Sequence, residues 1–264
     1  MPYQKVNGIQ VYYEDQGQGY PVLLIQGLGY PSGMWFRQIP ELAQQFRVLV
    51  IDNRGVGKTD KPDEEYTIAL MASDAAGLLR SLGIRKAHII GVSMGGYIAQ
   101  ELALSDPDMV NRLILLATSC GGPRYMELTK SLWDEVAALA GLPPREIIRR
   151  GMVLATTPDF YEKNPGLIER SVAIRLENLQ PLFAFIRQSH AAYSFNSTDR
   201  AHQIRQPTFI LAGAHDRVMP LSLTQELAQK IPRSRLKAFP DAAHLLFLEK
   251  AESVNQDIGD FLSR

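Results

Sequence analysis

The chain has 264 residues, and its 28 basic and 28 acidic side chains give it a formal net charge of zero. This length suits one large domain, with or without an insertion, whose core is large enough to be stable without disulfides or metals. A protein that binds nucleic-acid phosphates needs a basic surface field, so the balanced charge argues against that class.

The single cysteine and the N-terminal residues indicate where the protein works. Cys120 can form neither an internal disulfide nor a thiolate metal cluster, which favours a reducing compartment. The first residues lack the basic and apolar run of a signal peptide, and no apolar run is long enough to cross a bilayer. We therefore expect a cytoplasmic protein that binds neither nucleic acid nor membranes. Its oligomeric state, monomer or homodimer, stays open.

The predicted elements of the first half of the chain alternate between strand and helix. Asn7-Gly8, between two extended stretches, predicts a β-hairpin. Continuous apolar runs then predict buried strands, and runs of helical spacing predict helices. In chain order we expect strands over 21–25 and 47–51 with a helix over 35–46 between them, a helix over 67–82, a strand over 88–92, a helix over 95–104 and a strand over 110–117. This alternation is typical of an α/β fold with a mostly parallel sheet flanked by helices.

The alternation stops at residue 122 and resumes after residue 200. Between these positions we find only helical patterns, separated by Pro143-Pro144, Pro158 and Pro165. The remaining predictions are a strand over 208–212, a helix over 221–230, a strand over 235–239 and a helix over 251–262. The chain is therefore expected to form an α/β core from residues 1–121 and 201–264, interrupted by a helical cap from residues 122–200.

Two glycine-rich loops resemble nucleotide-binding motifs. In the stretch 27–33 the third glycine is one position later than the dinucleotide fingerprint requires, and Pro31 obstructs the helix that would bind the pyrophosphate. Gly57-Lys58-Thr59 looks like the end of a phosphate-binding loop, but Asp52 occupies a glycine position of that loop and would repel phosphate. We interpret this second loop as structural, held by glycine turns and by contacts between Asp52 and Arg54.

A third glycine-rich stretch, Gly91-Val92-Ser93-Met94-Gly95, fits the pattern G-x-S-x-G. It closes a predicted strand and opens a predicted helix, the context in which this motif lifts a serine hydroxyl off the end of a sheet. The two glycines leave room for the strand and the helix to pack closely. Ser93 is therefore our candidate nucleophile. The structural alternative is an ordinary turn that needs small residues.

A serine nucleophile needs a base and an acid that orients the base. Asp216 follows the predicted strand 208–212, and His244 follows the strand 235–239, so both belong to loops at the carboxyl ends of strands. Their order after Ser93 is that of α/β-hydrolase triads. Asp199 and Asp241 are rival acids. The other histidines, which we expect to be surface or packed residues, are His88, His190, His202 and His215.

With these motifs the chain resembles the α/β-hydrolase superfamily, and in particular its branch of small serine esterases, enol-lactonases and cofactor-free haloperoxidases. The resemblance rests on the stretches 26–29, 52–62 and 91–96 and on the two loops after the last strands. It implies an oxyanion hole formed by the backbone N–H groups of Leu28 and Met94, and a reaction that uses no metal and no organic cofactor. Members of this family commonly have His-Gly where this chain has Gln26-Gly27, which leaves the backbone donor in place.

The resemblance also implies hydrolysis of a small-molecule carboxylic ester or lactone through an acyl-serine intermediate. Enol-lactonase-like, perhydrolase and C–C bond hydrolase activities are alternatives with the same triad, and a small-molecule receptor with residual hydrolase activity is an alternative of another class. Arg124, Arg145 or another cap arginine is a candidate for binding a substrate carboxylate. The cap aromatics that could line the pocket, or equally pack in its core, are Tyr125, Trp133, Phe160, Tyr161, Phe183, Phe185, Tyr193 and Phe195.

Overall fold

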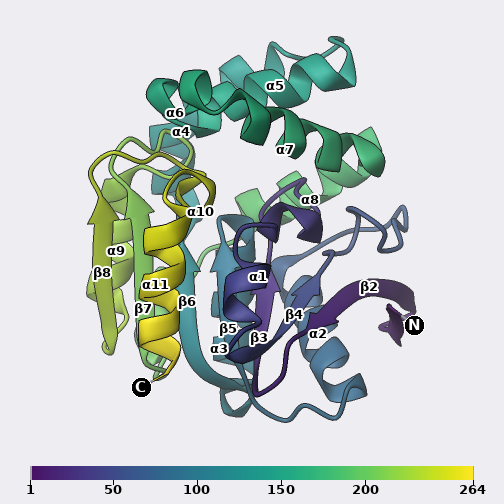
Figure 1. Ribbon diagram of the computed structural model, residues 1–264, viewed down its shortest axis with the longest axis vertical. Helices are drawn as coiled ribbons and strands as arrows, with labels where there is room; N and C mark the ends of the chain where they lie inside the picture. The colour runs from purple at the N-terminus through teal and green to yellow at the C-terminus, as the bar shows by residue number, and fades with distance from the viewer. Residues whose placement is uncertain (1, 264) are drawn as a thin grey trace.

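The structure is a computed structural model that describes residues 2–263. Its centre is an eight-stranded sheet with the strand order β1-β2-β4-β3-β5-β6-β7-β8 (Figure 1). The strands are β1 (Tyr3–Val6), β2 (Ile9–Gln16), β3 (Tyr20–Ile25), β4 (Phe46–Ile51), β5 (Ala87–Val92), β6 (Val110–Leu116), β7 (Thr208–Gly213) and β8 (Ser234–Phe239). At one edge β1 pairs antiparallel with β2, and β2 pairs antiparallel with β4. The other six strands, β3 to β8, are parallel to one another. The predicted α/β class with a mostly parallel sheet is confirmed.

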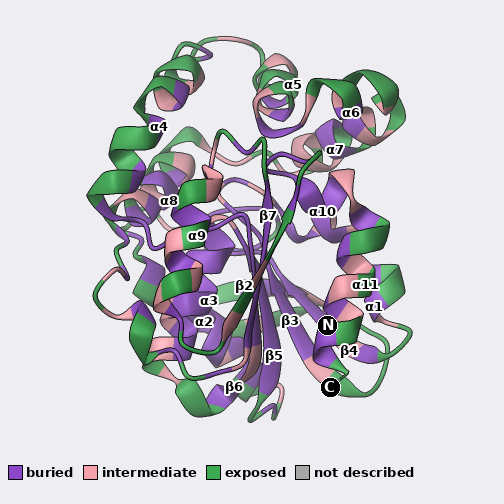
Figure 2. Ribbon diagram, turned by 90° about the vertical axis from the view of Figure 1, so that its left-hand side faces the viewer, coloured by how far each residue is buried: buried purple, intermediate pink, exposed green. Residues whose placement is uncertain are grey.

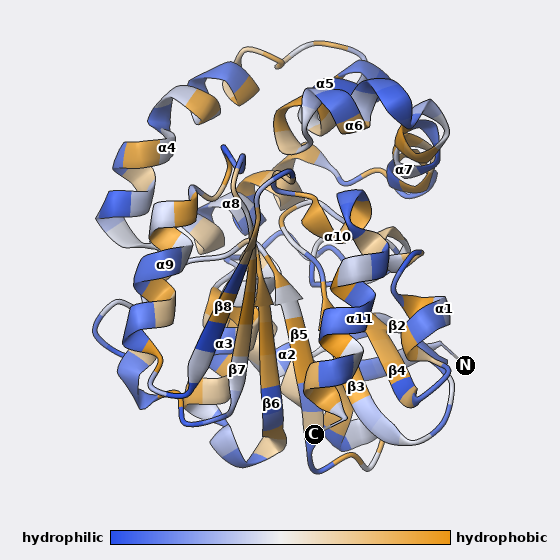
Figure 3. Cartoon of the chain, turned by 60° about the vertical axis from the view of Figure 1, so that its left-hand side comes forward, coloured by the Kyte–Doolittle hydropathy of each residue, from blue (hydrophilic) through white to orange (hydrophobic). Residues whose placement is uncertain are grey.

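Helices cover both faces of this sheet, as the view in Figure 2 shows. One face is covered by α2 (Ile68–Ser81), α3 (Met94–Ser105) and α9 (Leu221–Lys230), and the other by α1 (Ile39–Leu42) and α11 (Ala251–Leu262). The short α10 (Leu246–Glu249) joins β8 to α11. Figure 3 shows the apolar strands between helices whose outer sides carry hydrophilic residues.

The central strands are buried on both faces, which explains their continuous apolar sequences. In β3, Val22 and Leu24 pack into one half of the core, whereas Leu23 and Ile25 pack into the other, and none of the four is exposed. Since neighbouring strand residues point to opposite faces, each residue of such a run contributes to one of the two cores.

The antiparallel edge is formed by the predicted hairpin. Asn7 and Gly8 connect β1 to β2 and have φ of 46° and 83°. Two consecutive positive φ values are what a two-residue hairpin turn requires, and asparagine and glycine adopt them most easily.

The five helices between β6 and β7 lie together beyond the carboxyl ends of the strands (Figure 1). They are α4 (Gly122–Ala137), α5 (Pro144–Ala155), α6 (Pro158–Lys163), α7 (Pro165–Glu177) and α8 (Leu182–Ser194), and we call them the cap helices. Pro144, Pro158 and Pro165 each begin a helix, where the missing N–H of proline costs no hydrogen bond. The cap is therefore divided by the prolines that the sequence pattern marked, and additionally at Pro181, before α8.

The helix expected over 35–46 is wrong in its extent. The structure has a 3₁₀ helix over Ser32–Trp35 and a single helical turn, α1. Phe46 instead begins β4 and pairs with Tyr20 of β3. The strand pairing, which is not visible in the local spacing of apolar residues, takes Phe46 out of the helical pattern.

None of the helices within residues 2–263 is both long and apolar enough to cross a membrane.

Candidate active site

Ser93 lies on the sharp turn between β5 and α3. Its backbone has φ 56° and ψ −121°, a conformation that L-amino acids rarely adopt. Four hydrogen bonds hold the residue. Its N–H donates to Leu116 O at 2.9 Å, and its carbonyl accepts from Gly96 N at 2.8 Å, Tyr97 N at 3.3 Å and Thr118 Oγ1 at 2.9 Å. The turn is thus fixed between β6 and the first turn of α3, and the Ser93 side chain faces a cavity.

The glycines around Ser93 are required by close backbone contacts. A Cβ atom on Gly91 would lie 2.2 Å from Gly95 O, and one on Gly95 would lie 2.2 Å from Ile25 O. Both distances are far shorter than a van der Waals contact. A Cβ atom on Gly27 would lie 3.6 Å from Ser93 Oγ, so the loop after β3 passes directly beside the serine hydroxyl.

Asp216 and His244 are brought together by the loops after β7 and β8. His244 Nδ1 lies 2.8 Å from Asp216 Oδ2, and both residues are buried. The other carboxylate oxygen, Asp216 Oδ1, accepts hydrogen bonds from Val218 N at 2.8 Å and Met219 N at 2.7 Å. Because a carboxylate can only accept, Nδ1 is the donor and Nε2 is left free to accept a proton.

Ser93 and His244 both line one cavity of about 140 Å³, together with Leu28 and Met94. Within residues 2–263 the N–H groups of Leu28 and Met94 donate no hydrogen bond to another backbone or side-chain group. Two unused donors beside a serine hydroxyl are suited to hold a negatively charged oxygen.

Gln26 precedes the loop that contains Leu28, and its hydrogen bonds hold the start of that loop. Its side-chain Oε1 accepts from Gly27 N at 3.3 Å, and its backbone carbonyl accepts from Asn53 Nδ2 at 2.8 Å. Gln26 is 1% exposed. The glutamine therefore gives the loop a side-chain acceptor and leaves the N–H of Leu28 free.

Most of the cavity wall is apolar and comes from both the sheet edge and the cap helices. Four of the eight cap aromatics considered above line it: Tyr125, Trp133, Phe185 and Tyr193. The other four lie elsewhere. Phe195 stacks on Tyr97 at 4.6 Å, Phe160 and Tyr161 pack against the core, and Phe183 is partly exposed.

Among the residues that the structure describes, one arginine reaches this cavity. Arg175 of α7 lies over the ring of Tyr30, with 4.1 Å between the guanidinium carbon and the ring centroid, and both residues line the wall. It forms no ion pair with any residue in 2–263, and its buried Nε has no hydrogen-bond partner. Arg124 and Arg145, the two named carboxylate candidates, are paired with Glu226 and Glu169 instead and do not line the cavity. The mixed sequence of α7 gave no sign of which face meets the cavity.

The expected contact between Asp52 and Arg54 is not formed. Asp52 accepts from the backbone N–H groups of Ser32 at 2.6 Å and Lys58 at 2.7 Å, and a Cβ atom on Gly57 would lie 2.1 Å from its carboxylate. Burial raises the pKa of Asp52, although these hydrogen bonds oppose the shift. The glycine loop that resembled a phosphate site therefore encloses the protein's own carboxylate.

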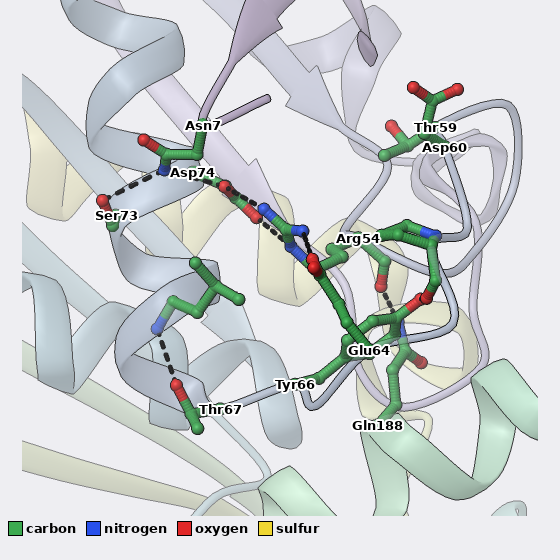
Figure 4. Close-up of polar contacts among 12 residues, drawn as sticks. Asn7, Arg54, Thr59, Asp60, Glu64, Tyr66, Thr67, Ser73, Asp74 and Gln188 are labelled. Atoms are coloured by element: carbon green, nitrogen blue, oxygen red, sulfur yellow. Dashed lines mark hydrogen bonds and ion pairs between the residues drawn. The ribbon is translucent and has the colours of Figure 1, made fainter. Parts of the chain in front are cut away.

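Arg54 turns away from Asp52 and pairs with Asp74 of α2 and with Glu64 (Figure 4). Its guanidinium binds Asp74 through two hydrogen bonds of 2.9 and 3.0 Å, and Asn7 holds the same carboxylate at 2.9 Å. The partner of Arg54 comes from a helix that lies 20 positions later, which the reasoning about neighbouring residues could not find.

The remaining candidates lie outside the cavity. Among the rival acids, Asp241 pairs with Lys250 rather than with His244. His88 is buried against Tyr20, and burial together with Arg112 lowers its pKa to about 4. Cys120 is a buried free thiol whose pKa is raised by burial.

Comparisons with known proteins identify the family of the chain. A model of the family described as the alpha/beta hydrolase fold matches residues 20–251. The chain is 31% identical to BpoC of Mycobacterium tuberculosis, provisionally named a non-heme bromoperoxidase, over 94% of this chain and 95% of BpoC. It is 28% identical to RutD of Azorhizobium caulinodans, provisionally named a carbamate hydrolase, over 92% of this chain and 91% of RutD. Among solved structures, the enol-lactonase from Burkholderia xenovorans LB400 superimposes with a TM-score of 0.89 at 26% identity, covering both chains completely.

Proposed function

The chain belongs to the α/β-hydrolase family, and from this premise we propose that it is a serine hydrolase that cleaves a carboxylic ester or lactone. The observation that carries the proposal is the 2.8 Å contact between His244 and Asp216 at the wall of the cavity that Ser93 also lines. Three loops that are far apart in sequence bring a nucleophile, a base and an orienting acid to one place.

In the first half of the proposed reaction, Ser93 Oγ attacks the substrate carbonyl. His244 Nε2 accepts the serine proton, and Asp216 holds the imidazole in the required tautomer. The substrate's C–O bond then breaks, and the proton passes from His244 to the departing alkoxide. The result is an acyl-serine and a free alcohol, or a single acyl-serine that retains the hydroxyl when the substrate is a lactone.

The negative charge that develops on the carbonyl oxygen is held by the N–H groups of Leu28 and Met94. Each such donor typically lowers the barrier by about 2.7–4 kcal/mol. In the second half, His244 takes a proton from water, the water attacks the acyl-serine, and the acid is released. The bond between Ser93 Oγ and the acyl carbon breaks, and His244 returns the proton to Oγ, which restores the serine hydroxyl.

Arg175 supports a second, narrower candidate: an ester or lactone that also carries a carboxylate, as in an enol-lactonase-like activity. An arginine that stacks on Tyr30 and has no ion-pair partner among residues 2–263 is a favourable site in an apolar cavity for a carboxylate, which it can bind through two hydrogen bonds. The enol-lactonase similarity is consistent with this substrate class.

The test is hydrolysis of p-nitrophenyl butyrate by the wild type and by Ser93→Ala. We expect kcat to fall by about 10⁴-fold or more in the variant, because no other nucleophile lies at the turn. Ser105→Ala is the matched control, since Ser105 is an exposed serine at the far end of the same helix and bonds only to Glu101 O. A lactone and an aryl carbamate complete the substrate panel.

Two results would overturn the proposal. Equal turnover by the wild type and Ser93→Ala would exclude Ser93 as the nucleophile. Absence of Ser93-dependent turnover with every ester, lactone and carbamate of the panel would favour a C–C bond hydrolase or a ligand receptor over an ester hydrolase.

A further inference from the structure

We infer that Gln188, on the cap helix α8, is a positioning residue for the oxyanion loop, so that the oxyanion hole is complete only while α8 is seated on the sheet edge. The oxyanion loop is here the turn of residues 27–30. This inference rests on the proposed function, because it assigns Gln188 a role in holding a donor of that reaction.

The Gln188 side chain belongs to the cap but makes its hydrogen bonds mainly to the core. Its Oε1 accepts from Gly29 N at 3.1 Å, and its Nε2 donates to Arg54 O at 2.7 Å. Oε1 also accepts from Gln180 Nε2 at 3.0 Å. Gln188 is completely buried. Losing the side chain would therefore leave backbone groups of both loops without partners.

The contact to Gly29 acts on the residue beside the proposed donor Leu28. The loop is a tight turn in which Tyr30 N donates to Gly27 O at 3.3 Å and Gly29 has φ 71°. The Gly29 N–H belongs to the peptide plane that follows Leu28, so fixing its direction restricts how the turn can rotate. The same turn carries the N–H of Leu28, the proposed donor, and Leu28 lines the cavity together with Ser93.

The cap also packs directly on this turn. A Cβ atom on Gly29 would lie 3.1 Å from Gln180 Oε1 and 3.5 Å from the ring of Phe185. Gln180 in addition donates to Gly55 O at 3.0 Å. Gln180, just before α8, and Phe185 and Gln188, within α8, therefore close over the oxyanion loop.

Arg54, to whose carbonyl Gln188 donates, is held firmly in place. Gln188 binds the carbonyl of Arg54, whose guanidinium is fixed by Asp74 and Glu64 (Figure 4). The side chain of Arg54 is only 1% exposed. Asp74 of α2 fixes Arg54, and Arg54 O in turn is an anchor that fixes one end of the Gln188 side chain. A displacement of α8 would therefore move the other end of the side chain, which binds Gly29 N.

The experiment compares Gln188→Met with the wild type and with Ser189→Ala. Methionine keeps the length of glutamine but can neither accept from Gly29 nor donate to Arg54 O. Ser189 is the next residue of α8 and hydrogen-bonds only to Phe185 O within its own helix, so it is the matched control. Amide hydrogen exchange of the peptide that contains residues 27–30, and kcat and KM for p-nitrophenyl butyrate, are measured for all three proteins.

We expect faster exchange of this peptide in Gln188→Met alone, and a kcat about tenfold lower with KM changed by less than about twofold. If Gln188 only stabilised the fold, Gln188→Met would lower the melting temperature but would not lower kcat selectively over KM. Should Gln188→Met fail to fold, Gln188→Glu serves instead, since its carboxylate still accepts from Gly29 but no longer donates to Arg54 O. With the anchor at Arg54 O lost, we expect faster exchange of the peptide of residues 27–30 than in the wild type, and exchange equal to that of the wild type would overturn the inference.

Unchanged exchange of this peptide together with an unchanged kcat in Gln188→Met would overturn the inference. A loss of kcat with unchanged exchange would also overturn it, because the loop would then not be what Gln188 holds. If the wild type shows no turnover that depends on Ser93, the proposed function fails, and the exchange measurement alone decides whether Gln188 holds the loop.

Discussion

At the scale of single residues, the backbone of Ser93 distinguishes a functional turn from an ordinary one. Its φ of 56° with ψ −121° costs about 1–3 kcal/mol for a residue with a side chain, whereas glycine would adopt it with little strain. The chain places glycine at positions 91, 95 and 96, on either side of the strained position, but not at the strained position itself. A turn selected only for close packing would have its glycine there. The strain therefore favours the nucleophile over the structural alternative.

His88 provides a prediction about pH. Its imidazole is 3% exposed, its Nδ1 has no hydrogen-bond partner, and its pKa is lowered from 6.5 to about 4 by burial and by Arg112. The folded state therefore resists protonation that the unfolded state accepts. The stability that neutral His88 provides is complete above about pH 6.5 and is lost as the pH falls toward 4.

We expect the free energy of unfolding of the wild type to fall by about 1–2 kcal/mol more than that of His88→Phe between about pH 7.5 and pH 5. Phenylalanine suits a position beside Tyr20 and Phe46 and cannot titrate. Denaturant unfolding of both proteins at both pH values measures the difference, and titration of all other groups cancels. An identical pH dependence in the two proteins would show that the pKa of His88 is not lowered in the folded state.

At the scale of elements, the sequence patterns correctly predicted those helices, strands and turns whose formation depends on neighbouring residues. The hairpin at Asn7-Gly8 and the strands over 21–25 and 47–51 follow from turn chemistry and from burial on both faces. The helix over 35–46 failed because pairing with Tyr20, a distant residue, takes Phe46 into β4.

The residues of the candidate site also fall into those that the sequence could predict and those that it could not. Ser93, Asp216 and His244 could be proposed from sequence because each follows a strand, and parallel strands end at one edge of a sheet. Gln188 and Arg175 could not, because their surroundings depend on how helices of the cap pack on that edge. The partner of Arg54 was missed for the same reason, since Asp74 belongs to a helix on the face of the sheet.

The contact between β3 and α3 gives a prediction at this scale. In Gly95→Ala the added Cβ atom would lie 2.2 Å from Ile25 O, which is backbone of a buried strand and cannot move aside cheaply. We expect a loss of at least about 2 kcal/mol in the free energy of unfolding. Gly259→Ala is the control, because it lies in helix α11 and its added Cβ atom meets nothing within 4 Å.

Gly259→Ala should be unchanged or stabilised by up to about 1 kcal/mol, since alanine is the better helix former. Urea unfolding of the two variants and the wild type measures both effects. Equal stability of Gly95→Ala and Gly259→Ala would mean that the close approach of helix and strand is not required.

At the scale of the whole molecule, the two parts of the chain have different tasks around one cavity. The sheet edge supplies Ser93, Asp216 and His244, and the cap helices supply most of the aromatic wall and Arg175. Glu249 ties the parts together, since its carboxylate accepts from Thr157 N and Oγ1 in the cap and from Ala243 N beside the proposed base. Changes in the cap side chains that line the cavity, unlike changes at Gln188, should therefore alter which substrate is accepted more than how the bond is broken.

Arg175 tests this division, because it is the charged cap residue at the cavity and has no ion-pair partner among residues 2–263. Mono-p-nitrophenyl adipate and p-nitrophenyl hexanoate differ mainly in a terminal carboxylate. In Arg175→Met we expect KM for the adipate to rise about tenfold or more, with KM for the hexanoate and both kcat values within about twofold of the wild type. Arg145→Met, which breaks an exposed ion pair with Glu169 away from the cavity, should leave both substrates unaffected. Equal effects on the two esters would mean that Arg175 shapes the wall without binding a carboxylate, and the preference for an anionic substrate would then have to be abandoned.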